Sequence, residues 1–351
     1  MAVSSWGVND ALAVKLWSKK LFREALKQTE MAKFMGEGSG SMIQVLNDTK
    51  KGAGDKITFG LRMQLTGAGI QGDGTLEGNE EALATYSDSI LINQLRHAVR
   101  SGGKMSEQRI PFSVREEARM GLQDWWADRI DQSLINQLCG VSSQSDTRYT
   151  GNNATSAPST GRFLFTLANE ASEASVSTTS TFTLALLDKA VATAKTATPL
   201  IRPIGGQSYD YVCFIHPNQT LTLRSSTATA GSWGDLAKAM LQGGQALDKN
   251  VFGSGALGIY NRTLIVENPR IPLLSIQGGA VGRRAVFCGA QAATFAVGQD
   301  NSPEKMSWVE ELFDYENQLG VSAGMIFGAK KCVFNSVDFG TITLPTAAPA
   351  P

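Results

Sequence analysis

The sequence has few of the residues on which metal sites, disulfide frameworks and membrane spans depend. It contains two histidines and four cysteines among 351 residues, and the cysteines lie far apart in apolar runs such as YVCFI and AVFCGA. Isolated cysteines of this kind are typical of buried thiols, and no Cys-x-x-Cys pair indicates a metal site. No apolar run approaches the roughly 18 residues of a membrane span. We therefore expect no cofactor, no metal and no membrane association, and folding in a reducing cytoplasm.

The sequence also has no excess of charge of either sign. Lys plus Arg and Asp plus Glu each number 32, so the formal net charge is zero. General nucleic-acid binding requires a basic surplus, so we expect contact with DNA to be non-specific at most. A neutral chain can pack against copies of itself without strong repulsion.

Familiar catalytic motifs are absent too. Neither a G-x-S-x-G nucleophile elbow nor a P-loop occurs. His216 follows an apolar run and precedes a proline, which favours a cap for the next helix over a metal ligand. His97 lies in a helix-like polar stretch, and the carboxylate pairs Glu116–Glu117 and Glu310–Glu311 are adjacent, as on solvated faces. We predict that the protein is not an enzyme, although residues that lie far apart in the sequence can still come together as a catalytic site.

A glycine-rich stretch, GAGIQG, spells the G-x-G-x-x-G of a dinucleotide-binding turn at Gly67, Gly69 and Gly72. That motif needs a helix to open at its third glycine, because helix amides hold the pyrophosphate. Two further glycines follow within six residues, and the acids here have no Lys or Arg between them: Asp73, Glu77, Glu80 and Glu81. A dinucleotide-dependent oxidoreductase therefore stays only a remote alternative.

The same stretch fits a long hairpin better. Residues 57–65 alternate between apolar and polar side chains, as in a strand with one wet face, and the chain returns at about 83–92. A two-stranded ribbon is marginal in water, so it needs a neighbour to lie on. We predict contacts with another copy of the chain from Phe59, Arg62, Gln64, Gly67, Gly69, Asp73, Glu77 and Glu80.

Two helices frame this hairpin in the sequence. Residues 8–35 carry a helical apolar stripe, which predicts an arm that contacts its own body or another copy through Trp17, Phe22 and Arg23. The strongest helix signal is 113–140, with apolar residues at every fourth position, a Ser113–Glu116 capping box and a glycine stop. Its acids, including Asp131, suggest an exposed polar side, and Trp125–Trp126 favours core packing over a stacking platform for a base or sugar.

The second half alternates helices and strands. Residues 141–181 indicate a long surface loop with one strand at 162–167, and a helix is expected at 181–196 before Pro199. A buried strand is expected at 209–216, a strand pair or a bent strand at 257–266, and another strand at 285–287, so 181–300 has the pattern of a compact α/β domain. From 307 to 344 apolar residues alternate again, which predicts long strands that return to the first body.

This order of parts resembles the major capsid proteins of tailed phages, with the fold named after phage Hong Kong 97. The resemblance covers nearly the whole chain. It is carried by LWSKKLFREALKQTEMAKFMGEGSGSMIQV, by GDKITFGLRMQLTGAGIQGDGTLEGNEE, by YVCFIHPNQTLTLRSS and by VFGSGALGIYNRTLIVENPRIP. The first two segments look like the branch found in certain short-tailed phages. The implied fold is α+β, and the implied function is an icosahedral shell of hexamers and pentamers around phage DNA.

The resemblance also implies a division of the chain. Its parts are a helical N-terminal arm at 1–40, a strand and extended hairpin loop at 41–103, a peripheral domain at 104–180 with a spine helix at 113–139, an axial domain at 181–300, strands returning to the peripheral domain at 301–344, and a flexible tail at 345–351.

Partners follow from the same resemblance. They are other copies of the chain, a portal, a possible decoration protein and a separate scaffolding protein, because no long scaffolding segment precedes the arm unless the chain is a mature form. The expected location is the virion capsid, assembled in the host bacterial cytoplasm. The namesake phage cross-links a loop lysine to an asparagine of another subunit, but residues 57–103 here contain no lysine. A nanocompartment shell of the same fold, as in encapsulins, is the nearer alternative.

Overall fold

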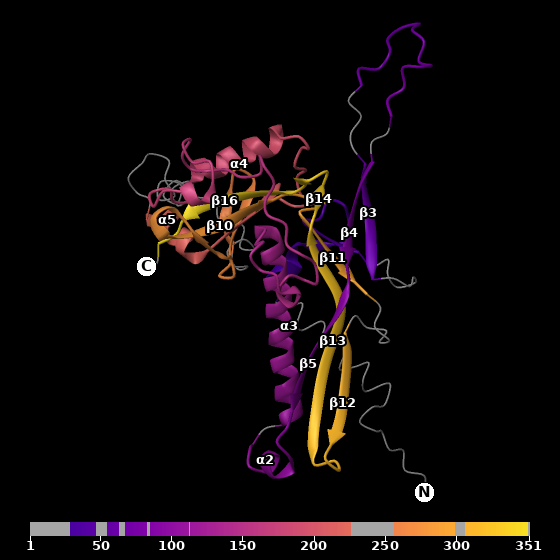
Figure 1. Cartoon of the computed structure of the whole chain (residues 1–351), viewed down its shortest axis with the longest axis vertical. Helices are drawn as coiled ribbons and strands as arrows, with labels where there is room; N and C mark the ends of the chain where they lie inside the picture. The colour runs from indigo at the N-terminus through magenta and orange to yellow at the C-terminus, as the bar shows by residue number, and fades with distance from the viewer. Residues whose placement is uncertain are drawn as a thin grey trace.

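Two six-stranded sheets, a long helix and a projecting ribbon dominate the part of the chain that the structure describes (Figure 1). The computed structural model describes residues 29–46, 55–62, 67–82, 85–111, 113–225, 256–298 and 306–349. Helices and sheets are mixed along the chain, as the α+β prediction requires. Within the described residues, no helix combines the length and the apolar character needed to cross a membrane.

The first sheet is built around β13 (Gln318–Lys331), which has neighbours on both edges. β5 (Asn93–Arg100) pairs antiparallel with one edge of β13, and β12 (Ser307–Phe313) pairs antiparallel with the other. Beyond the end of β12, β13 pairs with β11 (Ala293–Val297). The sheet then continues through β2 (Ile43–Leu46) to β1 (Met35–Gly36).

The long helix α3 (Val114–Cys139) lies along this sheet (Figure 1). Its stripe of buried residues packs against every second residue of β13, because side chains alternate between the faces of a strand. Gly140 has φ 63° and ends the helix in the left-handed conformation, as predicted. The buried stripe comprises Ala118, Leu122, Trp126, Ile130, Leu134 and Leu138.

Two expectations for α3 were wrong. Ser113 makes no side-chain cap, so the capping box does not form. Ser113 and Glu116 are exposed, and the first amides of a helix in solvent need no side-chain partner. Asp131 does not lie on an exposed polar side, because the residue is only 1% exposed.

The second sheet has the order β16–β10–β6–β8–β7, with β9 beside β10. Both of its faces are buried, as in sheets that are covered from two sides. On β6, Cys213 and Ile215 join the cluster formed with α4, whereas Val212 and Phe214 join the core around α3. The strands are β6 (Tyr211–Ile215), β7 (Ala256–Tyr260), β8 (Thr263–Glu267), β9 (Leu273–Ser275), β10 (Val281–Cys288) and β16 (Thr341–Ala347).

Helices α4 (Leu184–Thr196) and α5 (Pro217–Ser225) contribute apolar residues to this second core. Thr183 caps α4 by accepting a hydrogen bond from the Leu186 N–H at 3.3 Å. The shorter elements are α2 (Lys104–Gln108), η1 (Glu30–Phe34), η3 (Thr147–Tyr149), η4 (Glu173–Ser175), η5 (Gln277–Gly279), β14 (Val333–Phe334) and β15 (Val337–Asp338).

The ribbon consists of β3 (Lys56–Arg62) and β4 (Thr85–Leu91), paired antiparallel along their whole length. The predicted hairpin is therefore confirmed over its described residues. Its strands lie beside the upper part of β13, and residues 67–82 extend away from both sheets (Figure 1). We call residues 67–82 the ribbon tip.

Several elements differ from their predicted form or place. Residues 93–100 around His97 form strand β5 rather than a helix-like stretch, since β13 offers an edge to pair with. The strand expected at 162–167 shrinks to a single bridge between Phe163 and Thr343. β11 lies within 181–300 but belongs to the first sheet.

The end of the chain also departs from its predicted division. β16 does not return to the first body, because it pairs with β10 in the second sheet from Thr341 to Ala347. Residues 345–348 are buried rather than a flexible tail. Pro345 fits there because β16 is an edge strand, where a missing N–H costs no ladder bond.

Candidate assembly surfaces

The ribbon tip is fully open to solvent. Every described residue from 67 to 82 is exposed, including the apolar side chains of Ile70 and Leu76. The tip carries four acids and no Lys, Arg or His. Of the predicted contact residues, the tip brings together Gly67, Gly69, Asp73, Glu77 and Glu80.

Hydrogen bonds within the tip show what its glycines do. The Gly67 N–H donates to Glu81 Oε2 at 2.6 Å, and the Gly78 N–H donates to Glu80 Oε2 at 2.8 Å. Gly69 and Gly72 have positive φ values of 72° and 63°, a backbone conformation that is unfavourable for residues with a Cβ atom. No helix opens among the residues that follow Gly72 within the tip. The glycines therefore serve turns, and the amides that a pyrophosphate would need are not presented by a helix.

The other predicted ribbon residues have different positions. Phe59 is half-buried, and its ring packs edge-on against Phe334 of the same chain with centroids 5.9 Å apart. It therefore belongs to the root of the ribbon instead of its exposed part. Arg62 is the last residue of β3 and pairs through its backbone with Thr85, but its side chain lies outside the described part. Gln64 also lies outside the described residues.

The root of the ribbon is fixed to the body by apolar packing. Ile57 of β3 and Ile90 of β4 pack with Ile92 and with Ala296 of the first sheet. Tyr86 packs beside Phe59 against a small cluster formed by Cys332, Phe334 and Phe339. A two-stranded ribbon alone is marginal, so these contacts hold it in one direction.

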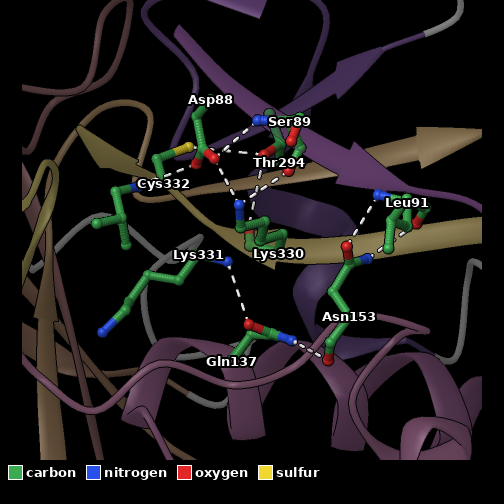
Figure 2. Close-up of polar contacts among 10 residues, drawn as sticks. Asp88, Ser89, Leu91, Gln137, Asn153, Thr294, Lys330, Lys331 and Cys332 are labelled. Carbon is green, nitrogen blue, oxygen red and sulfur yellow. Dashed lines mark hydrogen bonds and ion pairs between the residues drawn. The ribbon is translucent and has the colours of Figure 1, made fainter. Parts of the chain in front are cut away.

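A polar network reinforces the root (Figure 2). The Lys330 ammonium of β13 forms an ion pair with Asp88 of β4 and donates to the Ser89 carbonyl at 2.8 Å. The second carboxylate oxygen of Asp88 accepts from the Val333 N–H at 3.2 Å. Asp88 is therefore shared by two neighbours that flank the end of β13.

Asn153 completes the network from the loop that follows α3. Its side chain exchanges two hydrogen bonds with the backbone of Leu91, and its carbonyl accepts from Gln137 Nε2 at 3.0 Å (Figure 2). Gln137 in turn accepts from the Lys331 N–H at 3.4 Å. The network thus joins α3, β13 and the ribbon root through buried and half-buried polar groups that are hydrogen-bonded to one another.

Sequence reasoning missed these root residues. Asn153 lies in the predicted surface loop, and Gln137 lies on α3 outside the apolar stripe that predicts the helix. Their partners are far away in the chain, since Asn153 and Leu91 are 62 positions apart. The one local signal is that Gln137 lies among apolar residues near the end of a helix. A buried glutamine side chain there implies a hydrogen-bond partner.

A second junction fixes the start of the described chain. Asp131 of α3 accepts hydrogen bonds from the N–H groups of Glu30 and Met31 at 3.0 and 3.1 Å. Arg270 approaches the same carboxylate at 3.7 Å, and Asn268 donates to Glu30 at 2.7 Å. Burial raises the pKa of Asp131 to about 6, against the opposing effect of those two amides.

This junction is where the predicted arm meets the body. Trp17, Phe22 and Arg23 lie outside the described residues, so their contacts stay predictions. The last part of the predicted 8–35 helix is the 3-10 turn η1, which Asp131 and the loop after β8 hold in place.

The cysteine and histidine side chains that could take part in chemistry have structural roles. All four cysteines are free and buried, and burial raises the pKa of Cys139 and of Cys332 to about 12. His216 Nδ1 accepts from the Asn218 N–H at 3.1 Å and so caps α5, as predicted. Burial, with a smaller effect of Arg283, lowers the pKa of His216 to about 4.

The aromatic pair on α3 also has a structural explanation. Trp126 is fully buried in the core, which confirms that prediction. Trp125 stacks on His97 of β5 with centroids 4.6 Å apart, and Arg129 lies 5.1 Å from the same ring. A base or sugar would have to displace these neighbours. Among the described residues, no group of three His, Cys, Asp or Glu is placed to hold a metal ion.

Comparison with known proteins gives a consistent result. A sequence profile described as phage capsid protein matches residues 5–350. The major capsid protein of Pseudomonas phage KPP25 is 30% identical over 370 residues, covering 95% of this chain and 94% of that protein. The solved capsid of Ralstonia phage GP4 has a TM-score of 0.78 at 30% identity, over 91% of this chain and 90% of that one. The capsid of cyanophage Pam1 shares the fold, with a TM-score of 0.75 at 21% identity over 93% and 94% of the two chains.

Proposed function

The chain belongs to the family of phage capsid proteins and is a major capsid protein, and we propose a mechanical role for each of its parts in the shell. Copies of the chain form hexamers and pentamers that close an icosahedral shell around phage DNA. In this proposal the first sheet with α3 is the peripheral domain, the second sheet is the axial domain, and the ribbon is the extended loop.

The observation that carries the mechanism is the contrast between the two ends of the ribbon. Its root is held by apolar and polar contacts with the body, whereas every described residue of its tip is exposed to solvent. A rigidly rooted and exposed arm loses little conformational freedom when it binds, which favours association with a neighbouring copy. Shell stability then comes from the number of such modest contacts and from closure.

We propose that the acids of the tip set the register between copies. Asp73, Glu77 and Glu80 are exposed, so pairs with basic residues on the next copy add little strength each. They do discriminate between right and wrong alignments and speed up encounter. Arg62 and the arm residues Trp17, Phe22 and Arg23 are assigned to contacts between copies on the same reasoning.

No catalytic step is part of this proposal. The buried thiols are protonated at neutral pH and His216 is used as a helix cap, so these groups serve the fold. The lysine-dependent cross-link of the namesake phage is not proposed, since residues 57–103 lack lysine. Additional partners are a scaffolding protein, a portal and a decoration protein, with assembly in the host bacterial cytoplasm and DNA contacted only non-specifically.

The function is tested by expressing the full chain, alone and with the scaffolding protein of its phage. Closed shells of uniform diameter in negative-stain electron microscopy are the expected result. Only monomers or amorphous aggregate under both conditions would contradict it.

A further inference from the structure

A line of exposed residues runs along the outer side of α3. Glu117, Gly121, Asp124 and Asp128 are all exposed, and they follow one another at spacings of four, three and four. Residues at these spacings are neighbours on one face of a helix. A side chain added at Gly121 would meet nothing within 4 Å, so another helix can approach closely there. We call these four residues the acidic ridge.

The carboxylates of the acidic ridge have room for basic partners. Within the described residues, neither Glu117 nor Asp124 takes part in an ion pair. Asp128 pairs with Arg270 at 2.9 Å, but its side chain is still 58% exposed. Like charges four positions apart on a helix, as in Asp124 and Asp128, destabilise it slightly. A basic helix laid along the ridge would reverse that effect.

The backbone of the same chain is fixed at one end of this ridge. Asp131 lies one turn beyond Asp128, and its carboxylate accepts hydrogen bonds from the N–H groups of Glu30 and Met31 at 3.0 and 3.1 Å. The residues that precede Glu30 therefore leave from the end of the ridge. This anchor points to the arm, residues 1–28, as the occupant of the ridge.

The direction of the chain at this anchor also favours the arm. After Met31 the chain runs to the second sheet, where the Phe34 ring packs edge-on against Phe214 of β6 with centroids 5.5 Å apart. α3 ends at the same sheet, since Arg284 of β10 donates to the Cys139 carbonyl at 2.9 Å (Figure 1). The chain before Glu30 thus comes from the direction in which α3 begins, which is the direction of the ridge.

The arm carries basic residues at the spacing of the ridge. Residues 1–28 lie outside the described part of the chain, and their sequence is typical of an amphipathic helix. Lys20, Arg23 and Lys27 follow one another at spacings of three and four, so a helix places them on one face. The apolar stripe through Trp17 and Leu21 lies on another side of that helix.

The anchor sets the register between the two helices. Asp131 binds the Glu30 N–H at a separation of 101 positions. Thr29 is extended, with φ −70° and ψ 118°, which lengthens the path by about 2 Å relative to a helix. Long basic side chains span that difference. The same offset of 101 then places Lys20 beside Gly121, Arg23 beside Asp124, and Lys27 beside Asp128.

We propose that residues 16–28 lie as a helix along the acidic ridge of their own chain, parallel to α3, in the subunit before assembly. We call this segment the strap. Exposed ion pairs are individually weak, so the strap is held in register but is released easily. Its release lets Arg23 contact another copy, and that consequence rests on the proposed shell function. The strap thus keeps the arm on the free subunit until a neighbour competes for it.

A disulfide tests the position of the strap in the full chain, kept dilute and unassembled. Lys20→Cys with Gly121→Cys places two thiols at the closest approach of the helices, and the four native cysteines are buried. Lys20→Cys with Arg96→Cys, an exposed position on β5, is the matched control. After mild oxidation we expect a disulfide within one chain for the first pair and its loss for the second. Peptide mapping and non-reducing electrophoresis separate bonds within a chain from bonds between chains.

A charge exchange tests the register of the strap. Arg23→Asp should speed up hydrogen exchange of the amides at 16–28 by about three- to fivefold, the scale of one exposed ion pair. Asp124→Arg should have the same effect, and the chain with both substitutions should recover the slow exchange. In the unaltered chain, high salt should also speed up exchange at 16–28 because it screens these pairs.

Two results would overturn the inference. One is an oxidised Lys20→Cys, Gly121→Cys chain with no more internal disulfide than the control pair. The other is a charge-exchanged chain whose amides at 16–28 exchange as fast as in Arg23→Asp alone. Neither result touches the shell function, which electron microscopy of assembled chains decides separately. A chain that shows the strap but forms no shells would count against the proposed function and not against the strap.

Discussion

Asn153 and Leu91 exchange two hydrogen bonds although they lie 62 positions apart in sequence. The Leu91 N–H donates to Asn153 Oδ1 at 2.8 Å, and Asn153 Nδ2 donates to the Leu91 carbonyl at 2.9 Å. A single side chain thus imitates a strand at the outer edge of β4. The residue lies in a loop, yet it holds the end of β4 against the body.

Replacing Asn153 by alanine should loosen the ribbon root. Two backbone groups of Leu91 lose their partner, so we expect the free energy of unfolding to fall by about 2 kcal/mol. Hydrogen exchange of the amides at 88–91 should speed up, while exchange in β6 stays slow. Asn153→Asp is the matched variant, because it keeps the acceptor and loses the donor. Unchanged exchange in both variants would show that apolar packing alone fixes the root.

Deleting residues 66–79 removes most of the exposed tip and none of the root. We expect a soluble, folded subunit that forms no closed shells, because the body does not depend on the tip. Circular dichroism checks the fold, and electron microscopy checks assembly. Normal shells from the shortened chain would refute the role assigned to the ribbon.

Reversing the charge of Glu77 and Glu80 to lysine should slow assembly in a way that depends on salt. Steering between exposed charges is strong at low ionic strength and is screened within about 8 Å at physiological salt. The rate, followed by light scattering, should approach that of the unaltered chain as salt rises. Glu77→Gln with Glu80→Gln serves as the control without reversal and should show a smaller effect. Equal rates at low salt would count against register setting by these acids.

Asp131 predicts a pH dependence of stability. Its pKa of about 6 in the folded chain exceeds the ordinary 3.8, so the folded state binds a proton more tightly than the unfolded state. This contribution to stability is complete below pH 3.8 and is lost as pH rises through about 6. The difference of about two pH units corresponds to at most roughly 3 kcal/mol.

The variant Asp131→Asn cannot titrate and should flatten the urea-unfolding profile between pH 4 and pH 7 on this account. Asp124→Asn, at an exposed position of the same helix, is the control. The charged groups around Asp131 are Glu30, Arg270 and Asp128, so substitutions there should alter the profile as well. An identical slope in Asp131→Asn and the unaltered chain would exclude Asp131 as its source.

The local sequence pattern was sufficient to predict those elements in which buried residues recur at a single helical or strand spacing. The fourfold spacing from Ala118 to Leu138 and the stop at Gly140 defined α3 within one residue of its observed start. The apolar run at 211–215 gave β6, and the alternation from 57 gave β3. In these segments the side chains alone determine which face is buried.

Local pattern failed where a distant partner decides the structure. The polar residues of β5 form a strand because β13 supplies its edge, and β16 leaves the first body because β10 pairs with it at seven positions. Asp131 seemed suited to solvent until the backbone amides of Glu30 and Met31 filled its oxygens. The root network around Asn153 and Lys330 likewise depends on contacts between residues far apart in the chain. No local spacing of residues predicts such contacts.

β13 determines how the molecule bears a load. A pull on the ribbon enters the body at Asp88 and Lys330 and runs nearly parallel to β13 (Figure 1). Ladder bonds between antiparallel strands lie across that direction, so the bonds from β13 to β5 and β12 are sheared together and are not unzipped one after another. We therefore expect tension along the ribbon in a filled shell to be resisted by many hydrogen bonds at once.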